Sequence, residues 1–238
     1  MANTYAANFG DVVKHTVLCE VLVREQPARY LESHGGRLDY DLAEVEPGPG
    51  GVWDFIARSA EFDALDSSAY ARIIREVAGQ RERPGRYPGS VALADALLPT
   101  SMEMIVFELE RADGLSGVCK TARPGDLVLL DPFHVHERGD ELTAVEAFVA
   151  LASRLVGTIL WYAIYEPTDS AAWVAEATRS LDGSAWHARL VGDIPDGGLA
   201  GCGFLTAHLS PEAPSAATSV ARELTRALAA VRPGLRLE

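Results

Sequence analysis

Hydrophobic residues along the chain follow two different spacings, which predict two kinds of element. Apolar positions that recur every three or four residues predict helices, and short apolar runs predict strands. The expected helices cover 11–25, 52–79 (as one or two helices), 91–98, 142–156, 170–181 and 216–231. The expected strands cover 29–33, 104–109, 127–130, 158–165, 186–191 and 203–209. Because strands and helices alternate, the sequence predicts an α/β fold with a mostly parallel sheet.

Two segments add detail to this fold. The run Leu127–Leu130 is apolar at every position, as in strands of parallel sheets that helices cover on both faces. The range 52–86 interrupts the alternation of strands and helices, so we interpret it as a small helical insertion. With 238 residues, we expect one domain over 1–238 that contains this insertion.

Composition narrows the class of protein. Hydrophobic residues make up 48% of the chain, and Lys plus Arg (21) against Asp plus Glu (34) gives a net charge of −13. These values exclude disorder over most of the chain. No apolar run approaches the roughly 20 residues that span a bilayer, and the first residues do not resemble a signal peptide. We therefore expect a cytoplasmic protein with no membrane partner, in which Cys19, Cys119 and Cys202 are reduced and buried.

Candidate chemistry follows three of the expected strands. In an open α/β sheet, ligands bind beyond the carboxyl ends of the strands. His34-Gly35-Gly36 follows the first strand, and the acid Glu108 lies at the end of the next. A glycine turn lets the backbone approach a ligand, and an acid can accept hydrogen bonds from a ribose diol. This pairing is the general logic of a site for an adenosine-containing cofactor.

Asp131-Pro132-Phe133 ends the most apolar strand. A carboxylate and a backbone carbonyl there can accept hydrogen bonds from a planar amine while the aromatic ring stacks on it. Such contacts favour a nucleophilic nitrogen, placed for attack on a methyl donor. The alternative interpretation is an Asp-Pro turn that simply ends a strand.

Other common catalytic motifs are absent from the sequence. It has no phosphate-binding Gly-x-x-x-x-Gly-Lys-Ser/Thr loop, no Gly-x-Ser-x-Gly elbow and no His-Glu-x-x-His. His134 and His136 could join His187 or His208 around a metal, but a two-residue histidine spacing is common in polar loops. We therefore expect no metal site.

Five segments match, in order, the motifs of one known family. They begin at Asn8 (Asn-Phe-Gly-Asp-Val-Val-Lys-His-Thr-Val), Tyr30 (Tyr-Leu-Glu-Ser-His-Gly-Gly), Tyr87 (Tyr-Pro-Gly-Ser), Glu108 (Glu-Leu) and Ala112 (Ala-Asp-Gly, followed by Leu-Val-Leu-Leu-Asp-Pro from Leu127). Together they resemble the 23S ribosomal RNA adenine-N6 methyltransferases of the RlmJ type, from Asn8 to about Leu209. The chain has Phe133-His134 where that family has Pro-Tyr, and Gly36-Arg37-Leu38 where it has Gly-Ala-Gly.

The resemblance implies a Rossmann-like class I methyltransferase that uses S-adenosylmethionine. It implies cofactor contacts at Lys14, His15, His34, Gly35, Gly36, Ser90, Glu108, Asp113 and Gly114, with Lys14 supporting the site from the N-terminal helix. It implies that Asp131 is the catalytic acid, that Pro132 lends its carbonyl, and that Phe133 stacks on the acceptor, a role that His134 could also fill.

Three functions remain open at this stage. The first is methylation of adenine in ribosomal RNA, as in the family, with arginines between Arg72 and Arg86 (Arg81, Arg83 and Arg86 above all) as a docking surface for RNA. The second is the same chemistry on a small amine or nucleoside, which the acidic charge favours because nucleic-acid binders usually present basic surfaces. The third is a binding protein on this fold that has lost methyl transfer.

Overall fold

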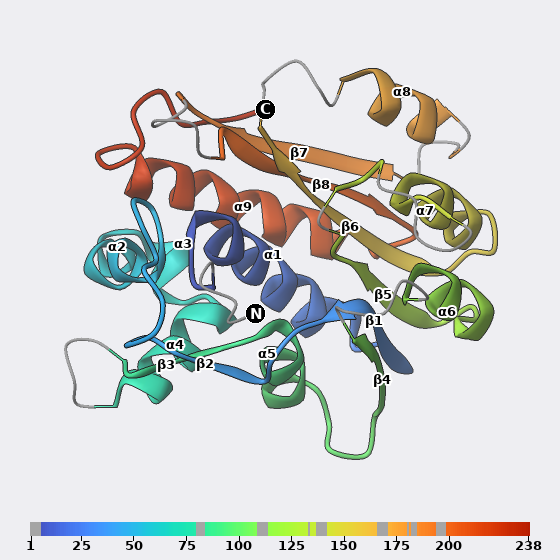
Figure 1. Cartoon of the computed structure of the whole chain (residues 1–238), viewed down its shortest axis with the longest axis horizontal. Helices are drawn as coiled ribbons and strands as arrows, with labels where there is room; N and C mark the ends of the chain where they lie inside the picture. The colour runs from blue at the N-terminus through green and yellow to red at the C-terminus, as the bar shows by residue number, and fades with distance from the viewer. Residues whose placement is uncertain are drawn as a thin grey trace.

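The computed structural model describes residues 6–79, 84–108, 114–132, 134–136, 142–165, 171–179, 181, 185–193 and 199–238. A seven-stranded sheet forms its middle layer, in the order β4-β1-β5-β6-β8-β7-β9 (Figure 1). The strands are β1 (Arg29–Gly35), β4 (Glu103–Glu108), β5 (Asp126–Leu130), β6 (Gly157–Ile164), β7 (Ala185–Val191), β8 (Gly201–Ala207) and β9 (Arg236–Leu237). Neighbours from β4 to β6 are parallel, whereas β8 is antiparallel to β6 and β7, and β9 is antiparallel to β7. The expected α/β fold with a mostly parallel sheet is confirmed.

The order of the strands creates a switch point between β1 and β5. From β1 the chain crosses to β4 on one side and then returns to β5 on the other side of β1. Connections that diverge in this way leave a crevice outside the carboxyl ends of the two strands, where ligands bind in open α/β sheets. His34 and Gly35 at the end of β1 and Asp131 directly after β5 therefore share this edge of the sheet.

Helices cover both faces of the sheet, with a hydrophobic core on each side (Figure 1). One core contains side chains of α1 (Phe9–Glu25), α2 (Val52–Arg58), α3 (Asp63–Asp66), α4 (Ala69–Ala78), α5 (Ser90–Leu97) and α9 (Glu212–Leu228). The other contains side chains of α6 (Gly114–Thr121), α7 (Ala144–Ala152) and α8 (Ala171–Arg179). The helices of the expected insertion thus contribute to the same core as α1 and α9.

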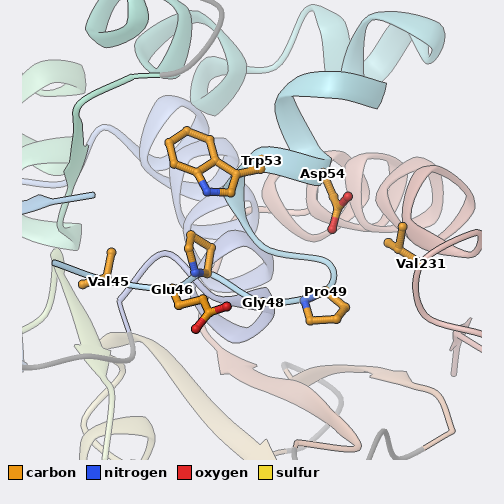
Figure 2. A pocket seen from close by; sticks show the side chains of 8 residues that line it. Val45, Glu46, Gly48, Pro49, Trp53, Asp54 and Val231 are labelled. Atoms are coloured by element: carbon orange, nitrogen blue, oxygen red, sulfur yellow. The ribbon is translucent and has the colours of Figure 1, made fainter. Parts of the chain in front are cut away.

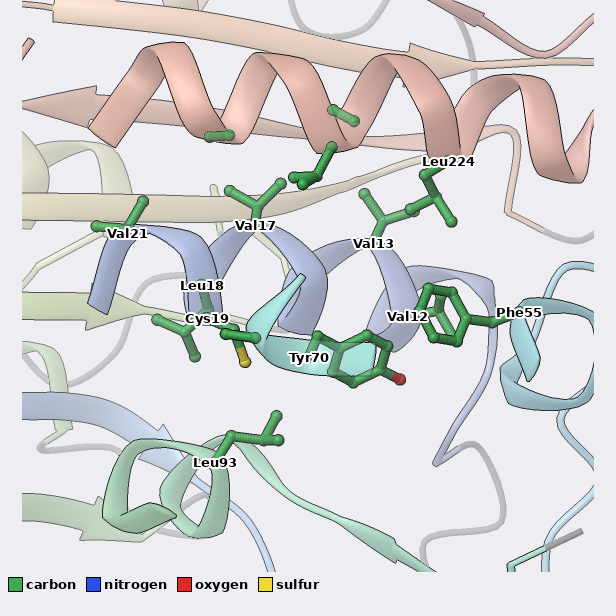
Figure 3. Close-up of a cluster of buried hydrophobic side chains, with 14 of the residues drawn as sticks. Val12, Val13, Val17, Leu18, Cys19, Val21, Phe55, Tyr70, Leu93 and Leu224 are labelled. Carbon is green, nitrogen blue, oxygen red and sulfur yellow. The ribbon is translucent and has the colours of Figure 1, made fainter. Parts of the chain in front are cut away.

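Helix α1 is buried on almost every side. It begins where the Asn8 side chain accepts a hydrogen bond from the Asp11 backbone N–H at 3.0 Å, the usual arrangement of an N-cap. Val13 and Val17 point toward α9, and Leu18 points toward α5, where Leu93 lies (Figure 3). A helix that is apolar around most of its circumference belongs in a core. Lys14 and His15, in the middle of α1, are therefore buried, whereas Arg24 in its last turn is exposed.

The structure differs from the sequence-based expectation in several short elements. Range 52–79 divides into α2, the 3-10 turn Ser59–Glu61, α3 and α4. Two strands were not expected: β3 (Arg86–Pro88) pairs antiparallel with β2 (Asp39–Asp41). These strands are three residues long, too short for an alternating pattern to be visible. Helix α6 was not expected either, because its glycines lower helix propensity, and neither was β9.

Within the described residues, no helix combines the length and the apolar character that crossing a membrane requires.

Candidate functional site

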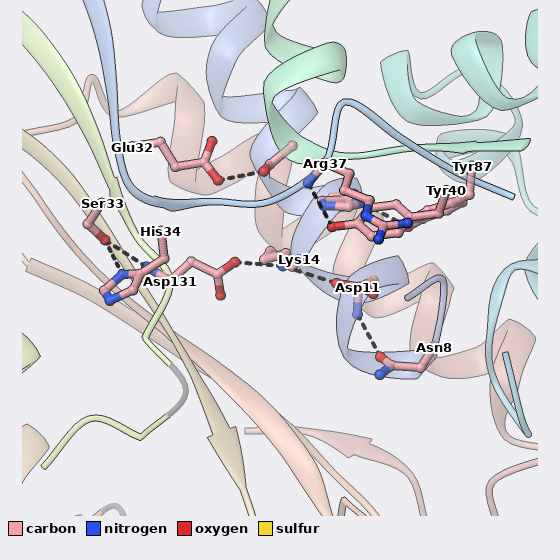
Figure 4. A network of polar contacts seen from close by, with 12 residues as sticks. Asn8, Asp11, Lys14, Glu32, Ser33, His34, Arg37, Tyr40, Tyr87 and Asp131 are labelled. Atoms are coloured by element: carbon pink, nitrogen blue, oxygen red, sulfur yellow. Dashed lines mark hydrogen bonds and ion pairs between the residues drawn. The ribbon is translucent and has the colours of Figure 1, made fainter. Parts of the chain in front are cut away.

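Lys14 joins helix α1 to the carboxyl end of β5 (Figure 4). Its Nζ lies 2.7 Å from Oδ2 of Asp131 and 3.0 Å from Oδ1 of Asp11. The same ammonium stands 5.2 Å from the centre of the Trp161 ring, within the range of a cation–π contact. Only 7% of Lys14 is exposed, so the two carboxylates and the ring replace water around the charge.

Electrostatics favour the charged forms of Lys14 and Asp11. Burial alone would lower the pKa of Lys14, but the charges of Asp131 and Asp11 outweigh it and raise that pKa above its ordinary value. Burial would raise the pKa of Asp11, yet the neighbouring Lys14 brings it below its ordinary value. Within the described residues, Oδ1 of Asp131 accepts no hydrogen bond, and 13% of the side chain remains exposed. One carboxylate oxygen is therefore fixed by Lys14, and the other is available to a ligand.

The end of β1 lies against the backbone of Asp131. Oγ of Ser33 is 2.6 Å from Nδ1 of His34 and accepts a weak hydrogen bond, 3.4 Å long, from the backbone N–H of Asp131. In the parallel register of β1 and β4, Gly35 stands opposite Glu108. Three adjacent strands, β4, β1 and β5, thus end with positions that the sequence analysis assigned to one ligand site.

One of the predicted glycines, Gly114, is required by a backbone contact within the protein. A Cβ on Gly114 would lie 2.0 Å from the carbonyl oxygen of Ser33, so glycine lets α6 begin directly against β1. A Cβ on Gly36 would lie 2.4 Å from the hydroxyl of Tyr40. That hydroxyl ends a side chain that can turn aside, so the backbone contact at Gly114 is the stricter requirement.

Glu32 is a functional candidate that the sequence analysis missed. It is fully buried in β1, where it accepts hydrogen bonds from Oγ of Ser90 (2.5 Å) and from the Tyr30 hydroxyl (2.9 Å). Burial raises the pKa of Glu32 to about 7, and the charge of Asp131 acts in the same direction, whereas Lys14 opposes it. The sequence offered one signal for this role: Glu32 directly follows the apolar pair Tyr30-Leu31 within an expected strand. Ser90, at the start of α5, is thus held against β1 by Glu32.

His15 lies within the core. Its ring stacks on Tyr87 with centroids 5.5 Å apart, and its Nδ1 is 2.7 Å from the Tyr87 hydroxyl. That hydroxyl in turn lies 3.0 Å from the hydroxyl of Tyr70. Burial, followed by the positive charge of Lys14, lowers the pKa of His15 to about 3. The imidazole is therefore neutral at physiological pH, and it anchors α1 to β3 and α4.

The remaining predicted residues are distributed as follows. Pro132 is buried. Phe133, Asp113 and the side chain of Glu108 lie outside the described residues, as do Arg81 and Arg83. Arg86 pairs with Asp39 at 2.6 Å, and Arg75 pairs with Asp66. Two of the arginines expected to dock RNA are thus matched by acids.

The histidines considered as metal ligands point to different neighbours. The His134 ring lies 5.5 Å from the ring of Tyr165, and the His136 ring lies 6.0 Å from that of Trp173. Nε2 of His187 is 2.6 Å from the Tyr162 hydroxyl. In the part of the chain that the structure describes, no group of three His, Cys, Asp or Glu side chains is arranged to hold a metal ion.

An open depression of about 570 Å³ lies elsewhere on the molecule (Figure 2). It is lined by Val45, Glu46, Pro47, Gly48, Pro49, Trp53, Asp54 and Val231. None of the predicted site residues contributes to it, so we place the candidate site at the switch point and not in this depression.

Comparison with known proteins bears on the fold. No protein-family model matches the chain, and no curated protein matches it. The crystal structure of protein LPL1258 from Legionella pneumophila (strain Philadelphia 1; family model DUF519) is similar over 98% of both chains, with a TM-score of 0.75 and 20% sequence identity. The two proteins share a fold. Function must therefore be argued from the residues at the switch point.

Proposed function

We propose that the protein is an S-adenosylmethionine-dependent N-methyltransferase that acts on the exocyclic amine of adenine in 23S ribosomal RNA. The observation that carries this proposal is the convergence of Asp131, His34 and Glu108 at the ends of three adjacent strands, with Lys14 fixing Asp131. A crevice at a topological switch point is where open α/β sheets bind nucleotide-like ligands. The family resemblance supplies the nature of the cofactor and of the acceptor.

The residues at the crevice fit such a cofactor chemically. Gly35 and Glu108 face each other across β1 and β4, which places a glycine beside an acid, as in sites that hold a ribose diol. His34 borders the same edge. When bound, S-adenosylmethionine supplies a methyl group on a positively charged sulfonium, which suits a crevice that presents the carboxylate of Asp131.

The chain's own residues would prepare the acceptor amine. Oδ1 of Asp131 accepts a hydrogen bond from the amine, while Lys14 holds Oδ2 and so fixes the orientation of the carboxylate. The backbone carbonyl of Pro132 accepts the second hydrogen. As the new N–C bond forms and the S–C bond breaks, the amine gives up one proton, which Oδ1 of Asp131 is placed to receive. Preorganised acceptors of this kind lower a barrier because they need no rearrangement during the reaction.

The direct test combines binding and transfer. We expect calorimetry to detect S-adenosylmethionine and S-adenosylhomocysteine, and Glu108→Ala to weaken binding by about 1.5–3 kcal/mol, the range for a hydrogen bond to a charged group. We also expect methyl transfer from labelled cofactor to unmodified 23S ribosomal RNA. Absence of both heat and thermal shift with either ligand would remove the basis of the proposal. Binding without transfer to any acceptor would instead indicate a binding protein on this fold.

A small amine or nucleoside is the second candidate acceptor. The ion pairs Arg75–Asp66 and Arg86–Asp39 favour it, because they neutralise part of the expected RNA-docking surface, and the net charge of −13 acts in the same direction. Phosphate contacts release counterions, so ribosomal RNA binding should weaken steeply with salt. Turnover of free adenosine at a rate insensitive to salt would favour this candidate.

A further inference from the structure

An exposed aromatic pair stands at the outer edge of the crevice. Tyr165 directly follows β6, and 45% of its surface is exposed. Among the described residues, the other large apolar side chains that are exposed are aliphatic. Its ring lies 5.5 Å from that of His134, at an angle of 45° between the planes. His134 is itself exposed. Single exposed apolar side chains need no explanation, but two rings brought together from the ends of two adjacent strands form a surface on which a flat ligand can stack.

The strand register fixes where this pair lies relative to Asp131. Leu130 of β5 pairs with Leu160 of β6, so Asp131 is level with Trp161. Tyr165 lies four residues further along, which is roughly 13 Å at about 3.3 Å per strand residue. His134 is three residues beyond Asp131, and the ~11 Å that the chain can span over three residues lets it reach Tyr165. Tyr165 therefore stands too far along the strand direction to cover the base whose amine is held at Asp131. The aromatic pair is placed for a different ring.

We propose that Tyr165 and His134 form a stacking platform for a second nucleobase, next to the base that is methylated, and that the acceptor is consequently a single-stranded nucleic acid. This inference rests on the proposed function and selects between its two candidate acceptors. Proteins that read single-stranded RNA stack splayed bases on Phe, Tyr, Trp or His. Each base–aromatic contact contributes about 1–3 kcal/mol and tolerates any base, because every base has a π face.

The test compares a strand with a free nucleoside. The substrates are a five-nucleotide RNA with a single central adenine, and adenosine. The variants are Tyr165→Ala, Tyr165→Phe and, as a matched control, Leu155→Ala, which removes an exposed apolar side chain just before β6, at the opposite end of that strand. For Tyr165→Ala we expect KM for the oligonucleotide to rise at least fivefold, the lower limit for one stacked base. Tyr165→Phe and Leu155→Ala should keep the wild-type KM.

Two further readouts separate the outcomes. Affinity for S-adenosylhomocysteine and turnover of adenosine should be the same in Tyr165→Ala and wild type, since the platform contacts neither. In Tyr165→Trp, the oligonucleotide should quench the fluorescence of the introduced indole, and adenosine should not. If the wild-type protein binds S-adenosylhomocysteine but Tyr165→Ala leaves the oligonucleotide KM unchanged, the platform is wrong and the proposed function stands. If the wild type binds no cofactor, the proposed function fails, and without quenching in Tyr165→Trp the platform fails with it.

Discussion

Lys14 and Asp131 are 117 residues apart in the sequence, and their Nζ and Oδ2 atoms are 2.7 Å apart in the structure. The ammonium is also held by Asp11 and by the face of the Trp161 ring. Because these contacts come from the protein alone, the carboxylate of Asp131 is oriented before any ligand arrives. Under the proposed function, this fixed orientation makes Asp131 a preorganised hydrogen-bond acceptor for the amine, and without that function it is a turn residue held by an ion pair.

Replacing Asp131 with asparagine tests that distinction. Asp131→Asn keeps the shape of the side chain but removes its charge and turns one side into a donor, so it can no longer receive the amine's proton. We expect turnover to fall about 10²–10³-fold, the scale of one preorganised contact in the transition state, with affinity for S-adenosylhomocysteine little changed. Rapid-quench transfer assays and calorimetry measure the two quantities. Wild-type turnover in this variant would identify Asp131 as a strand-ending residue.

Lys14→Met tests the energetic role of the buried cluster. It leaves Asp11 and Asp131 without their cation, and breaking a buried ion pair in this way costs about 3–5 kcal/mol. The pKa of Asp11 is lowered in the folded state, so its contribution is present above its ordinary pKa and is lost as the pH falls through the lower folded value. In urea unfolding, the free energy of unfolding of Lys14→Met should therefore lie well below that of wild type at pH 7. The difference should shrink toward pH 3. Lys120→Met, which alters an exposed lysine, should stay near wild type; equal deficits at both pH values would contradict this account.

Glu32→Gln should remove a pH dependence of stability. The pKa of Glu32 is raised from 4.5 to about 7 by burial, so the stabilisation associated with its protonated form is complete below its ordinary pKa and is lost as the pH rises through 7. From pH 5 to pH 8, the free energy of unfolding of wild type should therefore fall relative to that of Glu32→Gln. Denaturant titrations at both pH values check this, with the exposed Glu76→Gln as control. A constant difference across the range would show that Glu32 does not titrate there.

Gly114→Ala tests the contact between α6 and β1. The added Cβ would meet the Ser33 carbonyl at 2.0 Å, so either the helix or the strand end must shift. Overpacking of this kind costs about 1–3 kcal/mol, and the shift should also weaken S-adenosylhomocysteine binding, since Ser33 contacts both His34 and Asp131. Thermal unfolding and calorimetry measure the two effects. Thr121→Ala, in the last turn of the same helix, should change neither.

The sequence predicted features that are encoded locally. The uninterrupted apolar run before Asp131 predicted a strand that helices cover on both faces. The expected ends of three strands predicted that Asp131, His34 and Glu108 lie at one edge of the sheet. Glu32 was missed because an acid in a strand is ordinarily solvent-exposed. Its burial depends on Ser90, 58 residues away, a pairing that no local pattern reports.

The pairing of β2 with β3 escaped prediction for a related reason. Each strand has three residues, which is too few for an apolar pattern to be visible. The two strands pair antiparallel, and Arg86 forms an ion pair with Asp39 between them. The burial of Lys14 likewise follows from the packing of α1 against other elements. A lysine on an amphipathic helix is usually solvent-exposed, and only the family resemblance indicated a role for it.

The packing of α1 against α9 has a consequence for biosynthesis. Val13 and Val17 face α9 (Figure 3), whose residues follow those of α1 by about two hundred positions. While the chain is being translated, this face of α1 has no partner until α9 has left the ribosome. Contacts so distant in sequence form slowly and leave apolar surface open to aggregation in the meantime. The nascent chain should therefore depend on chaperones that shield α1, and the Lys14–Asp131 pair should form only as that late packing is completed.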